Sequence, residues 1–154
     1  MTLKIRKAEK KDIAKILELK RASMGPVWED SEIEYDEESL KKFIQSRFSK
    51  DRMMVVVQED SDELLGFLHS NTFEGAVSSD KVREILTIVI HLDHYGEGIG
   101  GKLMEKERKD AKEKGVDIMK LETLSNNERA LNFYREQDFS EKKKVMTKEL
   151  NDEK

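Results

Sequence analysis

The chain of 154 residues contains no cysteine and one proline, and aromatic side chains make up only 6% of it. The missing cysteines exclude disulfide bonds, thiolate metal ligands and a covalent intermediate on a cysteine. No apolar run approaches the roughly 18 residues that a membrane-spanning helix needs, and the N-terminus lacks the apolar core of a signal peptide. We therefore predict no membrane partner and a cytoplasmic location.

Charged residues are abundant by contrast, at 40% of the chain, with 29 Lys and Arg against 33 Asp and Glu. The net charge of −4 offers no overall field that would attract nucleic acid, so we predict no nucleic-acid partner. Apolar runs recur along the whole chain, which indicates a folded protein with a heavily charged surface rather than disorder. The length suits a single domain over residues 1–154.

Hydrophobic periodicity predicts a mixed α/β (α+β) fold. We expect strands at 2–7, 53–57, 64–73, 84–92 and 116–124 with one or two more within 139–150, and helices at 12–24, 37–49, 102–114 and 126–137. The Gly25–Pro26 pair is a typical helix end, and the short polar connection at 59–63 predicts a hairpin. This order predicts a mostly antiparallel sheet with one parallel βαβ crossover, flanked by about four helices.

One stretch, 84–101, combines a strand, a glycine loop and a helix start. Its first part is a nearly unbroken apolar run, which is typical of a strand that is covered on both faces. Its second part contains four glycines within six residues, directly before a helical segment. Glycines let the backbone approach a ligand closely, and the N–H groups of a helix N-terminus favour phosphate. The stretch therefore predicts an anion-binding site.

Two general phosphate motifs overlap on this loop. Gly96, Gly98 and Gly101 satisfy the dinucleotide fingerprint G-x-G-x-x-G, and Glu122 lies far enough downstream to bind a ribose hydroxyl. That fold needs several βαβ units, however, and only one is visible, so this interpretation is weakened but stays open. A Walker loop fails because Leu103 stands where the Mg²⁺-binding Ser or Thr is required.

A third interpretation rests on the whole chain. The element order, the segment HLDHYGEGIGGKLM, the block from Asn127 to Tyr134 (NERALNFY) and Phe139 five residues later resemble the GNAT superfamily of N-acetyltransferases. The family commonly has V-x-P-x-x-R-G-x-G-I-G-x-x-L, N-x-R-A-x-x-F-Y and Gly-Phe at these places. The resemblance covers almost all of the chain and is most specific over 84–139.

Three departures from the family pattern fall on the expected site. Tyr95 stands where Arg or Gln usually opens the loop, Glu97 where Lys or Arg is common, and Asp138 where the family has Gly. Because the loop acts mainly through backbone N–H groups, we expect weaker binding rather than none. Lys102 and Lys106 could partly compensate the lost positive charge.

The resemblance implies transfer of acetyl from acetyl-CoA to a primary amine, without a metal. The acceptor is a small-molecule amine, a polyamine or a peptide or protein amine, and the missing cysteine favours direct attack in a ternary complex over a ping-pong route. The residues that the resemblance assigns to the cofactor are Ile88, Val89, Ile90, Tyr95, Gly96, Glu97, Gly98, Ile99, Gly100, Gly101 and Asn127. Ile88 and Ile90 act through their backbone, to the acetyl carbonyl and the pantetheine arm.

By the same resemblance, Tyr134 is the candidate general acid for the departing thiolate, although a helix tyrosine can equally pack as core. Glu84 is the candidate base, against the plain interpretation of a solvated strand end. Trp28, Glu29 and Tyr35 are candidate acceptor contacts, because the acidic stretch 29–38 would attract a cationic amine.

Two other functions remain open from the sequence. A non-catalytic acyl-CoA-binding module would explain the three departures, and a nucleotide-binding oxidoreductase domain would explain the complete dinucleotide fingerprint. A homodimer is compatible with the sequence, which does not itself determine the oligomeric state.

Overall fold

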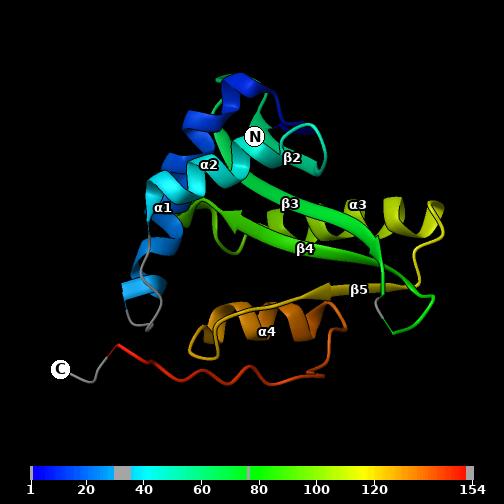
Figure 1. Cartoon of the computed structure of the whole chain (residues 1–154). Coiled ribbons are helices and arrows are strands. Elements are labelled where there is room, and N and C mark those ends of the chain that lie inside the picture. Colours follow the sequence, from blue (N-terminus) through cyan, green and yellow to red (C-terminus); the bar gives the residue numbers. More distant parts are fainter. Residues whose placement is uncertain (1, 30–35, 76, 152–154) are drawn as a thin grey trace.

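A computed structural model describes residues 2–29, 36–75 and 77–151, with only the backbone described for 24–29 (Figure 1). The strands are β1 (Leu3–Lys7), β2 (Arg52–Gln58), β3 (Leu64–Glu74), β4 (Lys81–Ile90) and β5 (Ile118–Leu121). The helices are α1 (Ile13–Glu29), α2 (Glu37–Arg47), α3 (Ile99–Glu113) and α4 (Glu128–Glu136), with short 3-10 turns at Lys10–Asp12 and Leu92–His94. None of the described helices is long and apolar enough to cross a membrane.

The five strands form one sheet in the order β1-β2-β3-β4-β5. The first three pairings are antiparallel and β4 pairs with β5 in parallel, which confirms the predicted hairpin and the single parallel crossover through α3. On β4, Leu86 is left out of the register between the pairs Ser70–Ile85 and His69–Thr87. This bulge reverses which face of the sheet the following residues point to.

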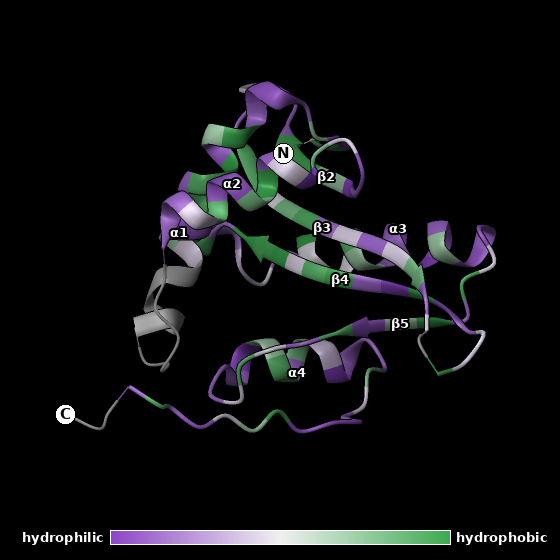
Figure 2. Cartoon of the chain, in the orientation of Figure 1, coloured by the Kyte–Doolittle hydropathy of each residue, from purple (hydrophilic) through white to green (hydrophobic). Residues whose placement is uncertain are grey.

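Two apolar layers cover the sheet, because strand side chains alternate between its faces. Met53, Val55 and Val57 of β2 pack under α1 and α2, whereas Met54 and Val56 pack toward α3. Figure 2 shows hydrophobic colouring over one half of β3 and β4, and alternating hydrophobic and hydrophilic bands along the helices. The layer on the α3 side also includes side chains of α4.

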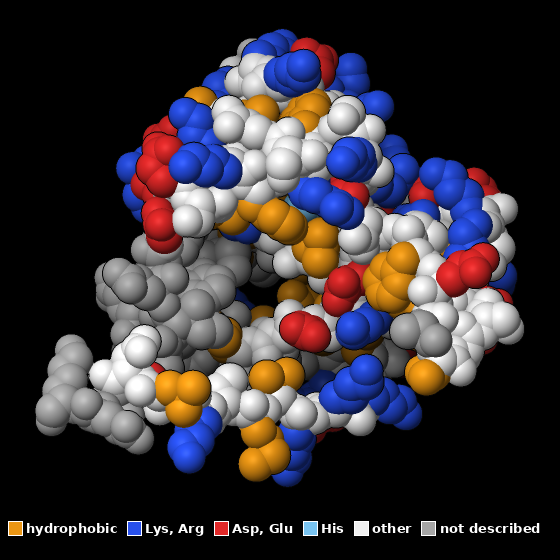
Figure 3. Space-filling view, viewed as in Figure 1, with side chains coloured by type: hydrophobic (Ala, Val, Ile, Leu, Met, Phe, Trp, Pro, Cys, Tyr) orange, Lys and Arg blue, Asp and Glu red, His pale blue; other side chains and the backbone are white. Residues whose placement is uncertain are grey.

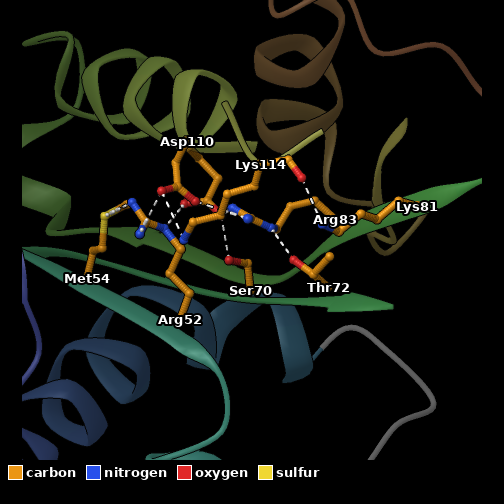
Figure 4. A network of polar contacts seen from close by, with 9 residues as sticks. Arg52, Met54, Ser70, Thr72, Lys81, Arg83, Asp110 and Lys114 are labelled. Atoms are coloured by element: carbon orange, nitrogen blue, oxygen red, sulfur yellow. Dashed lines mark hydrogen bonds and ion pairs between the residues drawn. The ribbon is translucent and has the colours of Figure 1, made fainter. Parts of the chain in front are cut away.

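A buried ionic network holds α3 against the sheet (Figure 4). Glu107 of α3 has no exposed surface and accepts hydrogen bonds from Arg52 Nε at 2.8 Å, Arg83 Nη1 at 2.6 Å and Ser70 Oγ at 2.5 Å. Asp110 lies 3.0 Å from Arg83 Nη2 and extends the network by one turn. Because an unpaired buried charge is costly, this network fixes the position of α3 and hence of the loop before it.

Two predictions were wrong: the end of the first helix and the strands expected near the C-terminal end. Helix α1 continues through Gly25–Pro26 to Glu29, because a proline removes only one helical hydrogen bond and does not by itself end a helix. Residues 139–151 form no strand, although one or two were predicted there. Val145, Met146 and Leu150 of this segment are 77%, 92% and 73% exposed, so too little apolar surface is buried to hold it on a sheet edge.

The boundaries of the parallel pair also differ from the prediction. Strand β4 begins at Lys81, not at residue 84, because a distant residue pairs with its polar first residue. Lys81 N donates to Asp117 Oδ2, and Asp117 N donates to Lys81 O. Strand β5 spans four residues instead of the predicted 116–124.

Candidate functional site

Strands β4 and β5 separate halfway along β4. They pair only from Val82–Ile85 to Ile118–Leu121, whereas β4 continues to Ile90. The last five residues of β4 therefore have no neighbouring strand on that side among the described residues, over roughly 16 Å at about 3.3 Å per residue. Figure 3 shows a hollow between this part of the molecule and α4, at the same place in the view as the gap between β4 and α4 in Figure 1.

The glycine loop at the end of β4 presents a helix N-terminus. Gly96 and Gly98 have φ of +84° and +79°, the left-handed region that other residues avoid, and Gly98 is the N-cap of α3. The first helical hydrogen bond is from Lys102 N to Gly98 O, so the amides of the three preceding residues, Ile99 to Gly101, have no helical acceptor. No acidic residue lies in the first turn of α3. This arrangement is suited to an anion.

Gly100 is required for a different reason, the close approach of α4. A Cβ at this position would lie 3.2 Å from Cζ of Phe133 and 3.7 Å from Cγ1 of Ile90. The absent side chain thus lets the N-terminus of α3, the end of β4 and the aromatic face of α4 meet at one point. The loop and α4 are held together as one unit.

The end of α4 places the ring of Tyr134. Phe139 N donates to Tyr134 O and Asp138 N donates to Arg135 O, both at 3.0 Å, which is the Schellman pattern of a helix C-terminus. That pattern needs a left-handed residue after the cap, and Asp138 has φ of +67° where the family has glycine. The accompanying apolar contact is between the rings of Tyr134 and Phe139, whose centroids are 6.1 Å apart. Phe139, together with Phe133, therefore packs against the Tyr134 ring and helps to hold it.

Tyr134 keeps its proton at neutral pH. Its ring packs partly buried in the apolar layer between α3 and α4, and burial raises the pKa of Tyr134 to about 12. A protonated hydroxyl in this layer, which also contains Ile88 and Ile90, is available as a hydrogen-bond donor.

The two unusual loop residues have local partners. The guanidinium of Arg129, from the first turn of α4, lies 4.2 Å from the ring centroid of Tyr95. His94 Nδ1 lies 2.6 Å from Glu97 Oε2. Arg129 thus brings a positive charge to the loop position where the family usually carries one, and the Glu97 carboxylate is engaged by a neighbour.

The remaining predicted site residues lie at separate places. Asn127 caps α4, accepting from Ala130 N at 3.2 Å. Glu84 lies in the paired half of β4, with a carboxylate oxygen 3.5 Å from Lys120 Nζ. Because its neighbour Arg83 points to α3, Glu84 points to the α1 and α2 side, four residues before Ile88.

The backbone positions of the cofactor prediction follow the unpaired edge of β4. Ile88 and Ile90 direct their side chains toward the α3 layer, and Val89 packs under α1 and α2. Trp28 and Glu29 lie on the described backbone of α1 but their side chains lie outside the description, and Tyr35 lies outside the described residues altogether. In the described part of the chain, no group of three His, Asp or Glu could hold a metal ion.

Sequence reasoning missed Lys20. This α1 residue is 6% exposed, and its Nζ donates to Thr87 Oγ1 of β4 at 3.0 Å. Burial lowers the pKa of Lys20 to about 8. The signal was present in the sequence, because position 20 continues the apolar helix positions Ile13, Ile16 and Leu17 at i+7, i+4 and i+3, on the face that a helix buries.

Comparison with known proteins identifies the class. The model of the acetyltransferase (GNAT) family matches residues 13–139, and the chain belongs to this family. An uncharacterized N-acetyltransferase of Archaeoglobus fulgidus is 34% identical over 100 residues, which cover 64% of this chain and 68% of that protein. The protein is therefore an acetyltransferase, and the oxidoreductase interpretation of the glycine loop is wrong.

Solved structures agree on the fold. A transcriptional regulator from Bacillus halodurans has a TM-score of 0.75 at 18% identity, with 97% of this chain and 100% of that chain covered. An aminoglycoside acetyltransferase from an uncultured soil metagenomic sample has a TM-score of 0.68 at 23% identity, covering 97% and 95%. At these identities, the likeness concerns the fold alone.

Proposed function

We propose that this acetyltransferase binds acetyl-CoA along the unpaired edge of β4 and transfers the acetyl group directly to a primary amine. One observation carries the proposal: the unpaired half of β4 leads into the amide-rich N-terminus of α3, and Tyr134 packs in the same apolar layer as Ile88 and Ile90. The GNAT family generally uses acetyl-CoA, whose thioester supplies the activated acetyl group.

The residues present fit the cofactor. A pyrophosphate suits the amides from Ile99 to Gly101, which lack helical acceptors, and Arg129 adds a cation close by. An extended arm that carries amides suits the edge of β4, which would bind it as a further strand. The N–H of Ile88 would then hold the thioester carbonyl, and the Asn127 side chain, which caps α4, would also hydrogen-bond the pantetheine arm.

The transfer requires two proton movements. The amine loses a proton, its nitrogen forms the C–N bond to the acetyl carbon, and the C–S bond breaks with its electron pair on sulfur. Glu84 is the proposed route for the amine proton, through water, since it points to the α1 and α2 side of β4 and its ion-pair partner is the half-buried Lys120 at 3.5 Å. Without a cysteine in the chain, no acyl-cysteine intermediate precedes this step.

Tyr134 assists the departing sulfur. Free thiols have a pKa of about 8.5, well below the pKa of about 12 that burial gives Tyr134. The hydrogen bond from its hydroxyl therefore stabilises the developing thiolate, and full proton transfer becomes easier as the same apolar surroundings raise the pKa of the thiol.

Ligand binding and turnover test the proposal separately. Acetyl-CoA and CoA should raise the unfolding temperature, while NAD and ATP should do so much less. Thiol release from acetyl-CoA should appear with a primary amine from a panel of polyamines, amino acids, aminoglycosides and peptide N-termini. No stabilisation by CoA, or stabilisation by NAD alone, would overturn the cofactor assignment.

The variant Tyr134→Phe isolates the hydroxyl, because phenylalanine retains the ring that packs against Phe139. We expect kcat to fall roughly 10²-fold with little change in the KM for acetyl-CoA, since the hydroxyl acts only as the sulfur leaves. Steady-state thiol release measures both constants. An unchanged kcat would remove Tyr134 from the mechanism and leave it a packing role.

A further inference from the structure

Lys20 is a buried cation that has no counter-ion among the described side chains. Its side chain reaches from α1 to β4 and forms one hydrogen bond, to the neutral hydroxyl of Thr87 at 3.0 Å. Among the described residues, no carboxylate lies within ion-pair distance of its Nζ. Burial lowers the pKa of Lys20 to about 8, so the amine is still mainly protonated at neutral pH. An ammonium has three donors, so two of them have no partner within the described part of the chain.

A second unsatisfied group lies one turn further along α1. Ser23 is 7% exposed and its Oγ has no hydrogen-bond partner. Residues three apart share one face of a helix, so Ser23 and Lys20 point to the same side of α1. Buried polar groups almost always have partners, so the unpartnered Ser23 hydroxyl beside the Lys20 ammonium, which forms one hydrogen bond, indicates a missing binding partner. A partner that suits both is an anionic acceptor of hydrogen bonds.

The neighbouring acidic groups are already engaged. His69 lies opposite Thr87 on β3, and its Nε2 is 2.7 Å from Asp51, whose carboxylate also binds Arg47 at 2.8 Å. The carboxylate of Glu84, on the same side of β4, is paired with Lys120. None of these groups supplies a negative charge to pair with the Lys20 ammonium.

The position of the pair relates it to the reaction. Thr87 directly precedes Ile88, so their Cα atoms are about 3.8 Å apart. The Lys20 ammonium therefore contacts the residue directly before the proposed thioester contact, on the side of β4 that α1 and α2 cover. An anionic group that binds there belongs to the acceptor, and only a few bonds separate it from the attacking nitrogen.

We propose that Lys20 and Ser23 form a carboxylate-binding subsite, so that the acceptor of this enzyme is an α-amino acid. The inference rests on the proposed acetyl transfer and specifies its substrate class. The carboxylate is bound and stays unchanged, while the α-amine forms the bond to the acetyl carbon. Polyamines lack the group that the subsite recognises.

Matched acceptors test the substrate class. Ornithine with putrescine, arginine with agmatine, and phenylalanine with phenethylamine each differ by one carboxylate. The wild type should use at least one amino acid with a kcat/KM about tenfold or more above that of its decarboxylated partner, as expected for a hydrogen bond to a charged group. Equal or better use of all three decarboxylated amines would overturn the subsite and leave acetyl transfer standing.

Variants assign the effect to the residue. Lys20→Met should raise the KM for the preferred amino acid about tenfold or more, with the KM for acetyl-CoA and the rate with the decarboxylated partner little changed. Ser23→Ala should raise the same KM a few-fold. Lys15→Met, five residues earlier in α1 and exposed, makes the same charge change and should leave all these constants as in the wild type. An unchanged KM in Lys20→Met would refute the proposal.

A binding measurement separates the carboxylate subsite from the proposed acetyl transfer. With CoA saturating, N-acetylornithine should raise the unfolding temperature of the wild type more than N-acetylputrescine does, and Lys20→Met should abolish that difference. A carboxylate-dependent shift without thiol release from any acceptor would support the subsite while contradicting transfer. No difference between the two compounds, together with no thiol release from any acceptor, would contradict both.

Discussion

Replacing Gly100 by alanine tests whether the glycine loop and α4 act as one unit. The added Cβ would lie 3.2 Å from Cζ and 3.3 Å from Cε1 of Phe133, closer than ordinary van der Waals contact. The φ of Gly100 is not in the left-handed region, so alanine introduces no backbone strain there. The helix propensity of alanine favours the variant by up to about 1 kcal/mol, and overpacking opposes it by about 1–3 kcal/mol.

The expected consequence for stability is a net loss between zero and about 3 kcal/mol. Gly101→Ala is the matched control, because it adds the same methyl group to the same turn, where the nearest atom is Nε2 of Gln137 at 3.9 Å. That variant should be stabilised by up to about 1 kcal/mol. Urea unfolding of the two variants measures the difference.

The expected consequence for activity follows from the neighbour of Phe133. Its ring centroid lies 5.5 Å from that of Tyr134, so a shift of Phe133 by a few tenths of an ångström moves the hydroxyl as well. We expect kcat for thiol release to fall several-fold more in Gly100→Ala than in Gly101→Ala. If Gly100→Ala is stabilised as much as its control and keeps full kcat, the contact between α3 and α4 is not as tight as the structure has it.

Two further changes concern departures from the family pattern. Arg129→Ala removes the cation that stacks on Tyr95, so the KM for acetyl-CoA should rise roughly 3–10-fold at low salt and less at high salt, with kcat retained. An increase in KM that does not depend on salt would contradict the phosphate role of Arg129. Asp138→Gly relieves the cost of a left-handed residue at φ of +67°, so the free energy of unfolding in urea should increase by about 1 kcal/mol; a decrease would mean that the Asp138 side chain stabilises the helix end.

The parts of the fold that the sequence predicted depend on local chemistry. Apolar periodicity, the polar hairpin connection and the glycine cluster each act within a few residues, and they predicted β2, β3, α3 and the loop between β4 and α3. The family resemblance added the block from Asn127 to Tyr134, whose cap and helix the structure contains. The bound cofactor and the roles of these residues stay predictions.

The parts that the sequence did not predict depend on distant partners. Arg52 and Glu107 are 55 positions apart, and with 40% charged residues nothing in the sequence distinguishes this pair from the many exposed ones. The polar start of β4 is a strand because of Asp117, and the segment 139–151 is not one because its apolar residues find no cover. Arg129 was visible in its motif, but its stack on Tyr95 was not.

Lys20 allows a test of the subsite that is independent of catalysis. An unfolded lysine has a pKa of 10.5, and burial lowers the pKa of Lys20 to about 8 in the folded protein. Below pH 8 both states bind the proton, and the full cost of burying the charge is present, about 3 kcal/mol for the shift. Between pH 8 and 10.5 the unfolded chain binds the proton more strongly, so this contribution makes stability rise with pH.

Lys20→Met should therefore stabilise the protein at pH 7 by about 2–3 kcal/mol, after the loss of the hydrogen bond to Thr87, and the advantage should shrink by about 2 kcal/mol by pH 9.5. Urea unfolding at both pH values measures it, with Lys15→Met expected to show no such pH dependence. A destabilised Lys20→Met at pH 7 would mean that the ammonium already has a counter-charge. The destabilising Lys20 side chain is explained if a bound ligand supplies the missing negative charge. N-acetylornithine with CoA should therefore stabilise the wild type more than Lys20→Met, and the difference in free energy of unfolding between the two proteins should become smaller. A difference that ligand leaves unchanged would show that the ammonium is not the group that the ligand contacts.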